Sequence, residues 1–307
     1  MLMIVNPTAG QGKVVDKFLD IIGLFTKAGF EVTVYTTADA RHGYDITLAR
    51  AAEFDYLVCA GGDGTLNELI SALLISPPQS RPLLGLIPSG SSNDFANTHG
   101  IPSDNPYLAA QMLVAAAPTS VDMGIFQEDR FFCYVAAFGI FTDVSYDTPQ
   151  GLKNMLGHAA YILQGVKKLA NLKHHHCRIE TESEVIEDDF IFGMVSNSRS
   201  VGGFRLPGDM NICLDDGRFE LLLLKKVQKL EDVANVISVL RGAEEVPDSS
   251  FIIRSVKKVR IICKDDLSWS IDGEFGGSFK VTDIAVRQKA LKALLPSPSQ
   301  AITKKRG

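Results

Sequence analysis

Residues 56–68, YLVCAGGDGTLNE, decide the fold of the first half of the chain. The apolar run 56–60 predicts a buried strand, and the pattern over 66–74 predicts a helix, so the glycines form the turn between them. Glycines let the backbone approach a phosphate closely, and the N–H groups at the start of a helix attract an anion. The stretch therefore predicts a ligand-binding turn of an open α/β sheet. The other interpretation is a plain turn in which Asp63 is the helix N-cap.

Two further loops follow predicted strands in the same manner. NPTAG (6–10) follows the strand 1–5, and PSGSSNDF (88–95) follows the strand 83–87. In the second loop Ser91 and Asn93 can hydrogen-bond phosphate and Asp94 can face substrate or metal, although these residue types are also ordinary N-caps. Parallel strands bring such loops to one edge of the sheet, so we expect one shared nucleotide site. The chain contains neither a Walker sequence nor a GxGxxG turn after the first strand.

The pattern changes near residue 121. Short β-rich runs follow one another, interrupted by helical patterns over 152–169 and 230–240, and this succession is typical of an antiparallel sheet. The predicted fold class is an α/β N-terminal nucleotide-binding domain followed by a β-rich antiparallel second domain. Near the N-terminus one buried helical face is predicted, formed by Val14, Val15, Phe18, Leu19, Ile22 and Phe25.

Two carboxylates stand close together in IDGE (271–274). Asp272 and Glu274, at positions i and i+2, point to the same side of an extended strand, and Gly273 lets the chain bend so that both reach one site. Phosphoryl transfer to an alcohol uses a carboxylate to accept the hydroxyl proton and Mg²⁺ to hold the phosphates. In an arbitrary protein the same four residues are more often a solvated turn, so their meaning depends on the upstream loops.

The motifs NPTAG, GGDGTLNE, PSGSSNDF and IDGE, in this order, make nearly the whole chain resemble the diacylglycerol kinase catalytic-domain family, in particular its soluble bacterial lipid kinases. The resemblance implies an NAD-kinase-like ATP-binding domain over 1–122 plus 287–307 and a β-rich lipid-substrate domain over 123–286. It also implies an ATP- and Mg²⁺-dependent kinase that phosphorylates a lipid hydroxyl, with diacylglycerol as one of several candidate acceptors.

The same resemblance implies roles for single residues. Glu274 is implied as the base, supported by Asp272, with Asp63 and Asp94 as further catalytic carboxylates. A structural Mg²⁺ site is implied in the segment 207–219, with the Asp216 carboxylate and the carbonyl groups of Cys213 and Arg218 as ligands. The implied ATP contacts are Asn6, Pro7, Thr8, Ala9, Gly10, Thr37, Gly61, Gly62, Asp63, Gly64, Thr65, Leu66, Asn67 and Ser91, and Asn93 joins them from its place in the loop. The family often has threonine where this chain has Ser91, which keeps the hydroxyl.

Composition limits the partners. The chain of 307 residues has 31 Lys and Arg against 36 Asp and Glu, a net charge of −5, which argues against broad nucleic-acid binding. Residues 225–264 hold nine basic and five acidic side chains, an excess of +4, which suits contact with anionic lipids or a solvated sheet edge equally. No apolar run approaches the ~20 residues of a membrane helix.

The five cysteines are widely spaced, which argues against disulfide bonds and for a reducing compartment. The sequence therefore predicts a cytoplasmic protein that meets its lipid at the inner membrane surface, with a homodimer as one compatible arrangement. The three histidines 174–176 are expected to lie in a solvated loop without carboxylate partners, and Trp269 to pack beside the site.

Two other functions stay open at this stage. An NAD kinase would share GGDGT, but NPTAG, SSNDF and the downstream DGE argue against it. A nucleotide-binding regulator without turnover is expected to lose its carboxylates, whereas the chain keeps Asp63, Asp94, Asp272 and Glu274.

Overall fold

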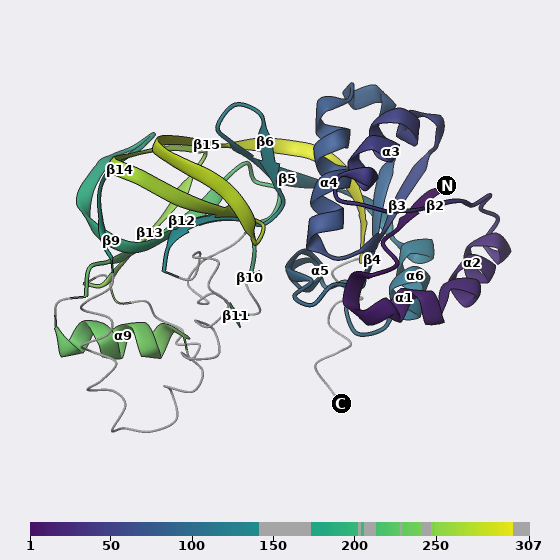
Figure 1. The fold of residues 1–307 in the computed structure, drawn as a ribbon, viewed down its shortest axis with the longest axis horizontal. Coiled ribbons are helices and arrows are strands. Elements are labelled where there is room, and N and C mark those ends of the chain that lie inside the picture. Colours follow the sequence, from purple (N-terminus) through teal and green to yellow (C-terminus); the bar gives the residue numbers. More distant parts are fainter. Residues whose placement is uncertain are drawn as a thin grey trace.

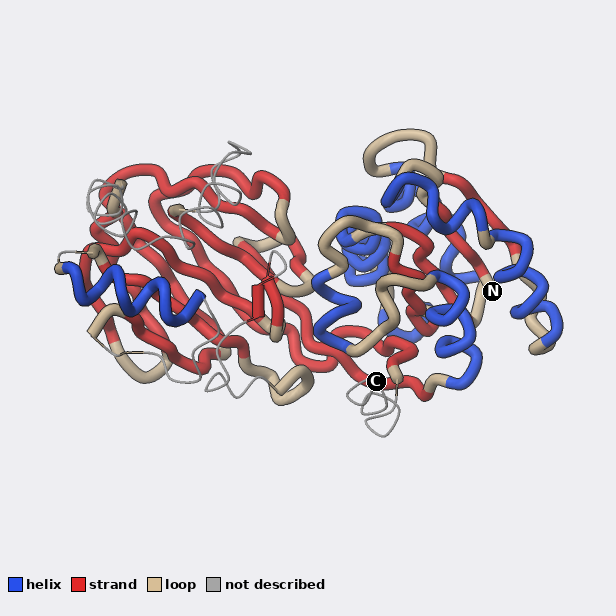
Figure 2. Tube along the Cα trace, turned by 90° about the horizontal axis from the view of Figure 1, so that it is seen from below, coloured by secondary structure: helices blue, strands red, loops and turns tan. Residues whose placement is uncertain are grey.

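The computed structural model describes residues 1–140, 173–201, 204–205, 213–227, 229–240, 247 and 249–296. The expected helix over 152–169 lies outside these residues. Figure 1 shows two halves side by side, one with helices packed around strands and one built almost wholly of strands. The same division is visible from below in Figure 2. One 13-stranded sheet runs through both halves, and the predicted fold class is confirmed.

The first half is a parallel sheet in the order β4-β3-β1-β2. Its inner strands are apolar because helices lie on both faces (Figure 1), which leaves the loops at the strand ends to carry polar chemistry. The strands are β1 (Leu2–Val5), β2 (Thr33–Thr36), β3 (Tyr56–Gly61) and β4 (Leu83–Pro88). The helices are α1 (Lys13–Asp16), α2 (Phe18–Lys27), α3 (His42–Arg50), α4 (Asp63–Ile75), α5 (Asp94–His99) and α6 (Pro106–Ala115), with 3-10 turns η1 (Ala9–Gly12), η2 (Ala51–Glu53) and η3 (Pro78–Ser80).

The predicted helical face near the N-terminus is wrong in part. The helix is interrupted at Lys17 between α1 and α2, so the apolar stripe is not continuous. Ile21 and Phe25 are buried as α2 packs on the sheet, whereas Leu19 is 83% exposed and Val15 is 52% exposed. The break rotates the second helix relative to the first, which a single 3.6-residue period does not anticipate.

The second half is antiparallel and encloses its own core. Aromatic side chains fill that core, including Phe126, Phe138 and Trp269, with Trp269 stacked edge-on between the two phenylalanines. Trp269 is therefore a core residue rather than a wall of the site. The elements are β5 (Ala117–Phe126), β6 (Arg130–Phe132), β7 (Val135–Gly139), β8 (His175–Thr181), β9 (Val185–Ser196), β10 (Ser200–Val201), β11 (Phe204–Arg205), β12 (Phe219–Lys225), α9 (Leu230–Leu240), β13 (Phe251–Val256), β14 (Lys258–Ile271) and β15 (Glu274–Leu295).

The 22-residue strand β15 joins the two halves, and Figure 1 shows it in yellow passing from one to the other. It pairs first with β14, then with β5, and near its end with β4 through Ala293 and Leu84. The domain boundaries expected near residues 122 and 287 fall inside the paired strands β5 and β15. The end of the described chain thus lies in the sheet of the first half.

Two expectations about the second half are wrong. Cys177 and Cys263 form a disulfide between the adjacent strands β8 and β14, with their Cα atoms 4.5 Å apart, because the strand register places them opposite each other. His176 on β8 has carboxylate partners: its Nδ1 lies 3.0 Å from Asp189 and its Nε2 3.3 Å from Glu187. None of the helices in the described ranges has the length and hydropathy to span a membrane.

Candidate active site

Three glycine-rich loops meet at the carboxyl edge of β1, β3 and β4. A Cβ built on Gly62 lies 3.0 Å from the Cα of Gly90, and one built on Gly10 lies only 1.7 Å from the Ser89 carbonyl oxygen. Gly10 also has a φ of 56°, so that position requires glycine. Because these glycines carry no side chains, the backbones of the three loops come close together at the N-terminus of α4. Such an arrangement fits a phosphate group, because peptide N–H groups and the helix dipole are accessible there.

Side chains fix the first loop against α4. Asn6 donates from Nδ2 to Thr65 Oγ1 at 3.0 Å, while its Oδ1 accepts from the backbone and hydroxyl of Thr8 at 3.1 and 2.9 Å. Thr37, at the end of β2, donates its backbone N–H to Val5 and so lies beside this loop. The other predicted contacts occupy the same edge: Pro7, Ala9 and Gly10 are half-buried in the first loop, Gly61 ends β3, and Gly64, Leu66 and Asn67 lie in the first turns of α4.

The loop after β4 is shaped by its own asparagine. Asn93 accepts from Gly90 N at 2.8 Å and donates to the Gly90 carbonyl at 2.9 Å, with a left-handed φ of 51°. Its amide therefore holds the loop, while Ser91 is exposed at the tip. Asp94 is buried at the start of α5. Ser91 and its neighbour Ser92 are the exposed side chains of this loop, so Ser91 is open to a ligand.

The two carboxylates of IDGE have different surroundings. Asp272 and Gly273, with φ values of 48° and 85°, form the tight turn between β14 and β15. The Asp272 side chain is 6% exposed and accepts four hydrogen bonds. The donors are Asn67 Nδ2 at 2.8 Å and the backbone N–H groups of Cys133, Tyr134 and Val135 at 2.7, 3.1 and 3.1 Å. Asp272 is thus committed to holding the hairpin against α4 and the β6–β7 connection.

Glu274 is exposed and lies directly over the glycine turn. A Cβ built on Gly64 lies 2.9 Å from Glu274 Oε1, so the carboxylate occupies the space beside the first turn of α4. The sheet therefore brings together the GGDGT loop of the first half and the DGE hairpin of the second. A carboxylate that is accessible and adjacent to a phosphate-binding loop can accept a proton from a reacting hydroxyl.

Asp63 and Asp94 add negative charge beside the hairpin. Asp63 accepts from the backbone N–H groups of Asp94 and Phe95 at 3.3 and 3.4 Å, which places its carboxylate at the start of α5. Burial, with the charge of Asp94 next, raises the pKa of Asp63 to about 6, and the charge of Asp272 adds to the rise. Burial also raises the pKa of Asp272. Carboxylates gathered in this way suit a bound cation, which would favour their ionised forms.

The turn before β12 contains the predicted metal ligands. Asp216 and Cys213 are exposed there, and Asp216 Oδ1 accepts from Arg218 N at 2.9 Å. Behind the turn, the fully buried Asp122 accepts from the N–H groups of Gly217 and Lys289, each at 2.6 Å. Burial is the main cause that raises the pKa of Asp122, with the Asp216 charge adding to it.

Two buried polar atoms beside this turn, Glu220 Oε2 and Asn197 Oδ1, have no hydrogen-bond partner among the residues that the structure describes. Burial, and then the charge of Asp216, raise the pKa of Glu220 to about 7. Orphaned oxygens next to an acidic turn fit a hydrated cation that would orient water toward them. The described residues contain no group of three or more His, Cys, Asp or Glu side chains arranged to hold a metal. The predicted set differs in kind, since it uses one carboxylate and two carbonyl groups.

Sequence reasoning missed three residues. Asp122 ties β5 to the turn before β12, and the signal for it is a lone charge in the apolar run VDMGIF. Glu68 accepts from Arg41 N and Gly43 N at 2.8 and 3.1 Å and so caps α3, although the quoted motif GGDGTLNE includes it. Tyr134 contributes both a backbone donor and a side chain to the site, and nothing in its sequence context marks it.

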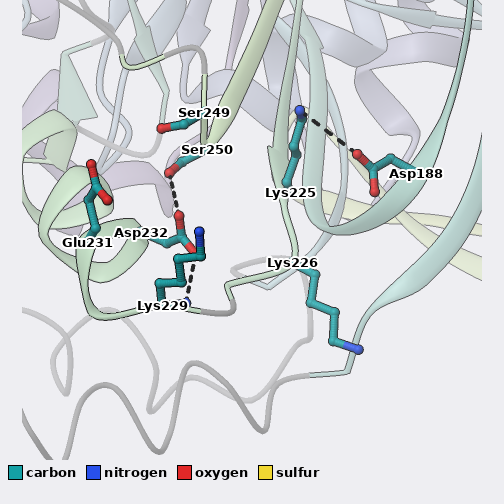
Figure 3. Close-up of a pocket in the computed structure, with 8 residues that line it drawn as sticks. All are labelled: Asp188, Lys225, Lys226, Lys229, Glu231, Asp232, Ser249 and Ser250. Carbon is teal, nitrogen blue, oxygen red and sulfur yellow. Dashed lines mark hydrogen bonds and ion pairs between the residues drawn. The ribbon is translucent and has the colours of Figure 1, made fainter.

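A pocket of about 250 Å³ lies in the second half, near the start of α9 (Figure 3). Its lining combines Lys225, Lys226, Lys229, Asp188, Glu231, Asp232, Ser249 and Ser250. Lys225 lies 3.9 Å from Asp188, and the Lys229 N–H donates to Asp232 at 2.8 Å. The basic stretch at 225–264 is therefore matched by acidic groups here rather than forming a uniformly positive patch.

Comparison with known proteins gives the family. Residues 1–126 match the family described as diacylglycerol kinase catalytic domain, and residues 138–295 match the YegS C-terminal NAD kinase beta sandwich-like domain. The diacylglycerol kinase of Bacillus subtilis strain 168 is 34% identical over 279 residues, which cover 90% of this chain and 89% of that protein. The chain belongs to the diacylglycerol kinase family. It is thus a kinase that phosphorylates a lipid hydroxyl.

Other relatives agree with this membership. A diacylglycerol kinase of Staphylococcus aureus strain MRSA252 is 33% identical over 90% of this chain and 86% of its own length. A crystal structure of a diacylglycerol kinase from Bacillus anthracis has a TM-score of 0.75 at 21% identity, covering 97% of each chain. An NAD kinase from Archaeoglobus fulgidus, solved with ATP, has a TM-score of 0.52 at 12% identity over 98% of this chain and 94% of that one. Likeness at such identities concerns the fold alone.

Proposed function

We propose that this lipid kinase transfers the γ-phosphoryl group of ATP to the free hydroxyl of diacylglycerol, giving phosphatidic acid and ADP. The observation that carries the proposal is the place of Glu274, whose carboxylate stands 2.9 Å from a Cβ built on Gly64 in the phosphate-binding turn. The proposed base, Glu274, is thus next to the proposed phosphate-binding turn, as in-line transfer of a phosphoryl group to an alcohol requires. The relatives that are diacylglycerol kinases support this acceptor, and the fold shared with an NAD kinase solved with ATP supports this donor.

The residues divide the chemistry between them. The backbone of the three loops would hold the phosphates at the start of α4, with Asn6, Thr65 and Ser91 around them. Glu274 accepts the proton of the acceptor hydroxyl as its oxygen attacks the γ-phosphorus and ADP departs. Asp272 positions the hairpin that carries Glu274. Mg²⁺ bound with ATP would neutralise phosphate charge, and Asp63 and Asp94 are the carboxylates placed to hold it.

A second Mg²⁺ is proposed at the turn before β12, held by Asp216 and the carbonyl groups of Cys213 and Arg218. The support is the pair of orphaned oxygens on Glu220 and Asn197 beside that turn. The turn is held by Asp122, which also bonds Lys289 on β15, so a cation here would stiffen the junction between the halves.

The test is an acceptor panel with radiolabelled ATP and Mg²⁺. The panel contains dioctanoylglycerol, phosphatidylglycerol, ceramide, sphingosine and NAD, with the labelled product identified by mass spectrometry. Labelled phosphatidic acid as the main product, lost in Glu274→Gln, is expected. Labelled NADP, or label in another lipid with dioctanoylglycerol unlabelled, would refute the proposed acceptor.

Action at a membrane surface is part of the proposal, because diacylglycerol resides in bilayers. Near α9 the basic side chains lie beside acidic ones, as Lys225 does beside Asp188. Any attraction to anionic lipid should therefore depend on other basic residues of 225–264, such as Lys257 and Lys258, and vesicle flotation measures it. The expected homodimer stays a prediction, measurable by light scattering of the purified chain.

A further inference from the structure

Tyr134 reaches the active site from the short connection between β6 and β7. Its backbone is fixed on both sides: its N–H donates to Asp272 at 3.1 Å, and its carbonyl accepts from Ser196 Oγ at 2.7 Å and from Asn197 N at 3.1 Å. The residue is 5% exposed, and its hydroxyl lies 3.7 Å from the position of a Cβ built on Gly273, in the turn that carries Glu274. The ring is therefore held in place with its polar end against the DGE hairpin.

The hydroxyl of Tyr134 lies in an acidic part of the site. Burial, followed by the charges of Asp272, Asp63 and Asp94, raises the pKa of Tyr134 well above that of a free phenol. The group is thus a neutral donor at every working pH. Within the described residues the Tyr134 hydroxyl makes no hydrogen bond, and its oxygen keeps some contact with solvent.

Other donors at the hairpin are already engaged. The Asn67 amide donates to Asp272 at 2.8 Å and to the Phe131 carbonyl at 3.1 Å. The remaining side chains there, Asp63, Asp94 and Glu274, are acceptors when ionised. A glycerolipid carries ester carbonyl oxygens next to its free hydroxyl, and these oxygens can accept a hydrogen bond from a neutral donor.

We propose that Tyr134 recognises the acyl ester of the lipid acceptor, its hydroxyl donating a hydrogen bond to the ester carbonyl oxygen that neighbours the free hydroxyl. The inference rests on the proposed function and assigns a specificity residue to it. The attacking oxygen itself is left without a donor, which keeps its lone pair available for the γ-phosphorus, while Glu274 takes its proton. The kinase should therefore act with a higher kcat/KM on ester lipids than on lipids of the same shape that have ether linkages.

The test compares two acceptors in two enzymes. Wild type and Tyr134→Phe are assayed with 1,2-dioctanoylglycerol and its ether analogue 1,2-dioctylglycerol, in octyl glucoside micelles containing phosphatidylglycerol. In the wild type we expect kcat/KM to be about tenfold higher for the ester, the effect of one hydrogen bond. In Tyr134→Phe the ratio of ester to ether falls to about one, with the KM for ATP unchanged.

Tyr56→Phe, at the opposite end of β3 where Tyr56 stacks on Phe30, is the matched control and keeps the wild-type ratio. The ratio is internal to each enzyme, so a loss of active protein does not change it. Equal rates for ester and ether in the wild type, or an unchanged ratio in Tyr134→Phe, would overturn the inference. Failure of the wild type to phosphorylate either glycerolipid would instead refute the proposed function.

Discussion

Replacing each carboxylate of the DGE hairpin with an amide, one at a time, distinguishes the structural role of Asp272 from the proposed catalytic role of Glu274. Asp272→Asn keeps the shape of the side chain but offers one acceptor oxygen in place of two, so about two of its four hydrogen bonds are lost. Hydrogen bonds to a charged acceptor contribute about 1.5–3 kcal/mol each. Burial disfavours the charged carboxylate and so raises the pKa of Asp272. Replacing that charge with a neutral amide offsets part of the loss of hydrogen bonds. We expect a net destabilisation of about 2–4 kcal/mol.

Glu274→Gln removes an exposed carboxylate, so its free energy of unfolding should stay within about 0.5 kcal/mol of the wild type. Its kcat should fall by ~10²–10⁴ while the KM for ATP hardly changes, because glutamine cannot accept the hydroxyl proton. Each variant is the control for the other. Urea unfolding and steady-state kinetics with dioctanoylglycerol measure both effects.

Two results would refute this reasoning. If Asp272→Asn unfolds at the wild-type urea concentration, the four hydrogen bonds do not hold the hairpin. If Glu274→Gln keeps wild-type kcat, another carboxylate accepts the proton, and Asp94 becomes the candidate. A loss of kcat in Asp272→Asn alone decides nothing, since a displaced hairpin also displaces Glu274.

Three other predictions follow from the same geometry. Gly64→Ala places a methyl group 2.9 Å from Glu274 Oε1, so kcat should fall at least tenfold while helix α4 is no less stable, measured by kinetics and thermal unfolding; wild-type kcat would contradict it. The raised pKa of Asp63 means that its stabilising contribution is full below about pH 4 and is lost as pH rises through about 6. Asp63→Asn should therefore gain stability over the wild type between pH 4 and 7 in chelator, and a gap independent of pH would contradict it. Asp216→Ala should lose most of the rise in melting temperature that Mg²⁺ gives the wild type, and an equal rise in both would leave Asp216 a turn residue.

The parts of the site that are local in sequence could be predicted. The 13 residues 56–68 contain a strand, a glycine turn and the start of a helix. The polar loops after β1 and β4 also follow a strand and precede a helix. Strand order places such loops together without any long-range information beyond the α/β pattern. Asn93 shows the limit of such prediction, since its amide bonds Gly90 within its own loop and the same residue type could equally have faced a ligand.

Contacts between distant segments could not be predicted. Cys177 and Cys263 are 86 residues apart, and their pairing depends on the register of β8 against β14. Asn67 and Asp272 are separated by 205 residues, so no spacing rule links them. Asp122 and Tyr134 lie in apolar runs whose pattern indicates only strands. Their contacts are with segments distant in the sequence, such as Gly217 for Asp122 and Asp272 for Tyr134.

The hydrogen bond from Asn67 to Asp272 joins helix α4 of the first half to the β14–β15 hairpin of the second. Asn67 belongs to the helix that follows the proposed phosphate loop, while Asp272 belongs to the hairpin that carries Glu274, the proposed base. A base must lie within hydrogen-bond reach of its proton, and small displacements cost large factors in rate. The continuous strand β15 runs from Glu274 to its pairing with Leu84 of β4, so the strand that begins at Glu274 joins the sheet of the first half. Any change that shears β15 against β4 should therefore lower kcat before it lowers the affinity for ATP.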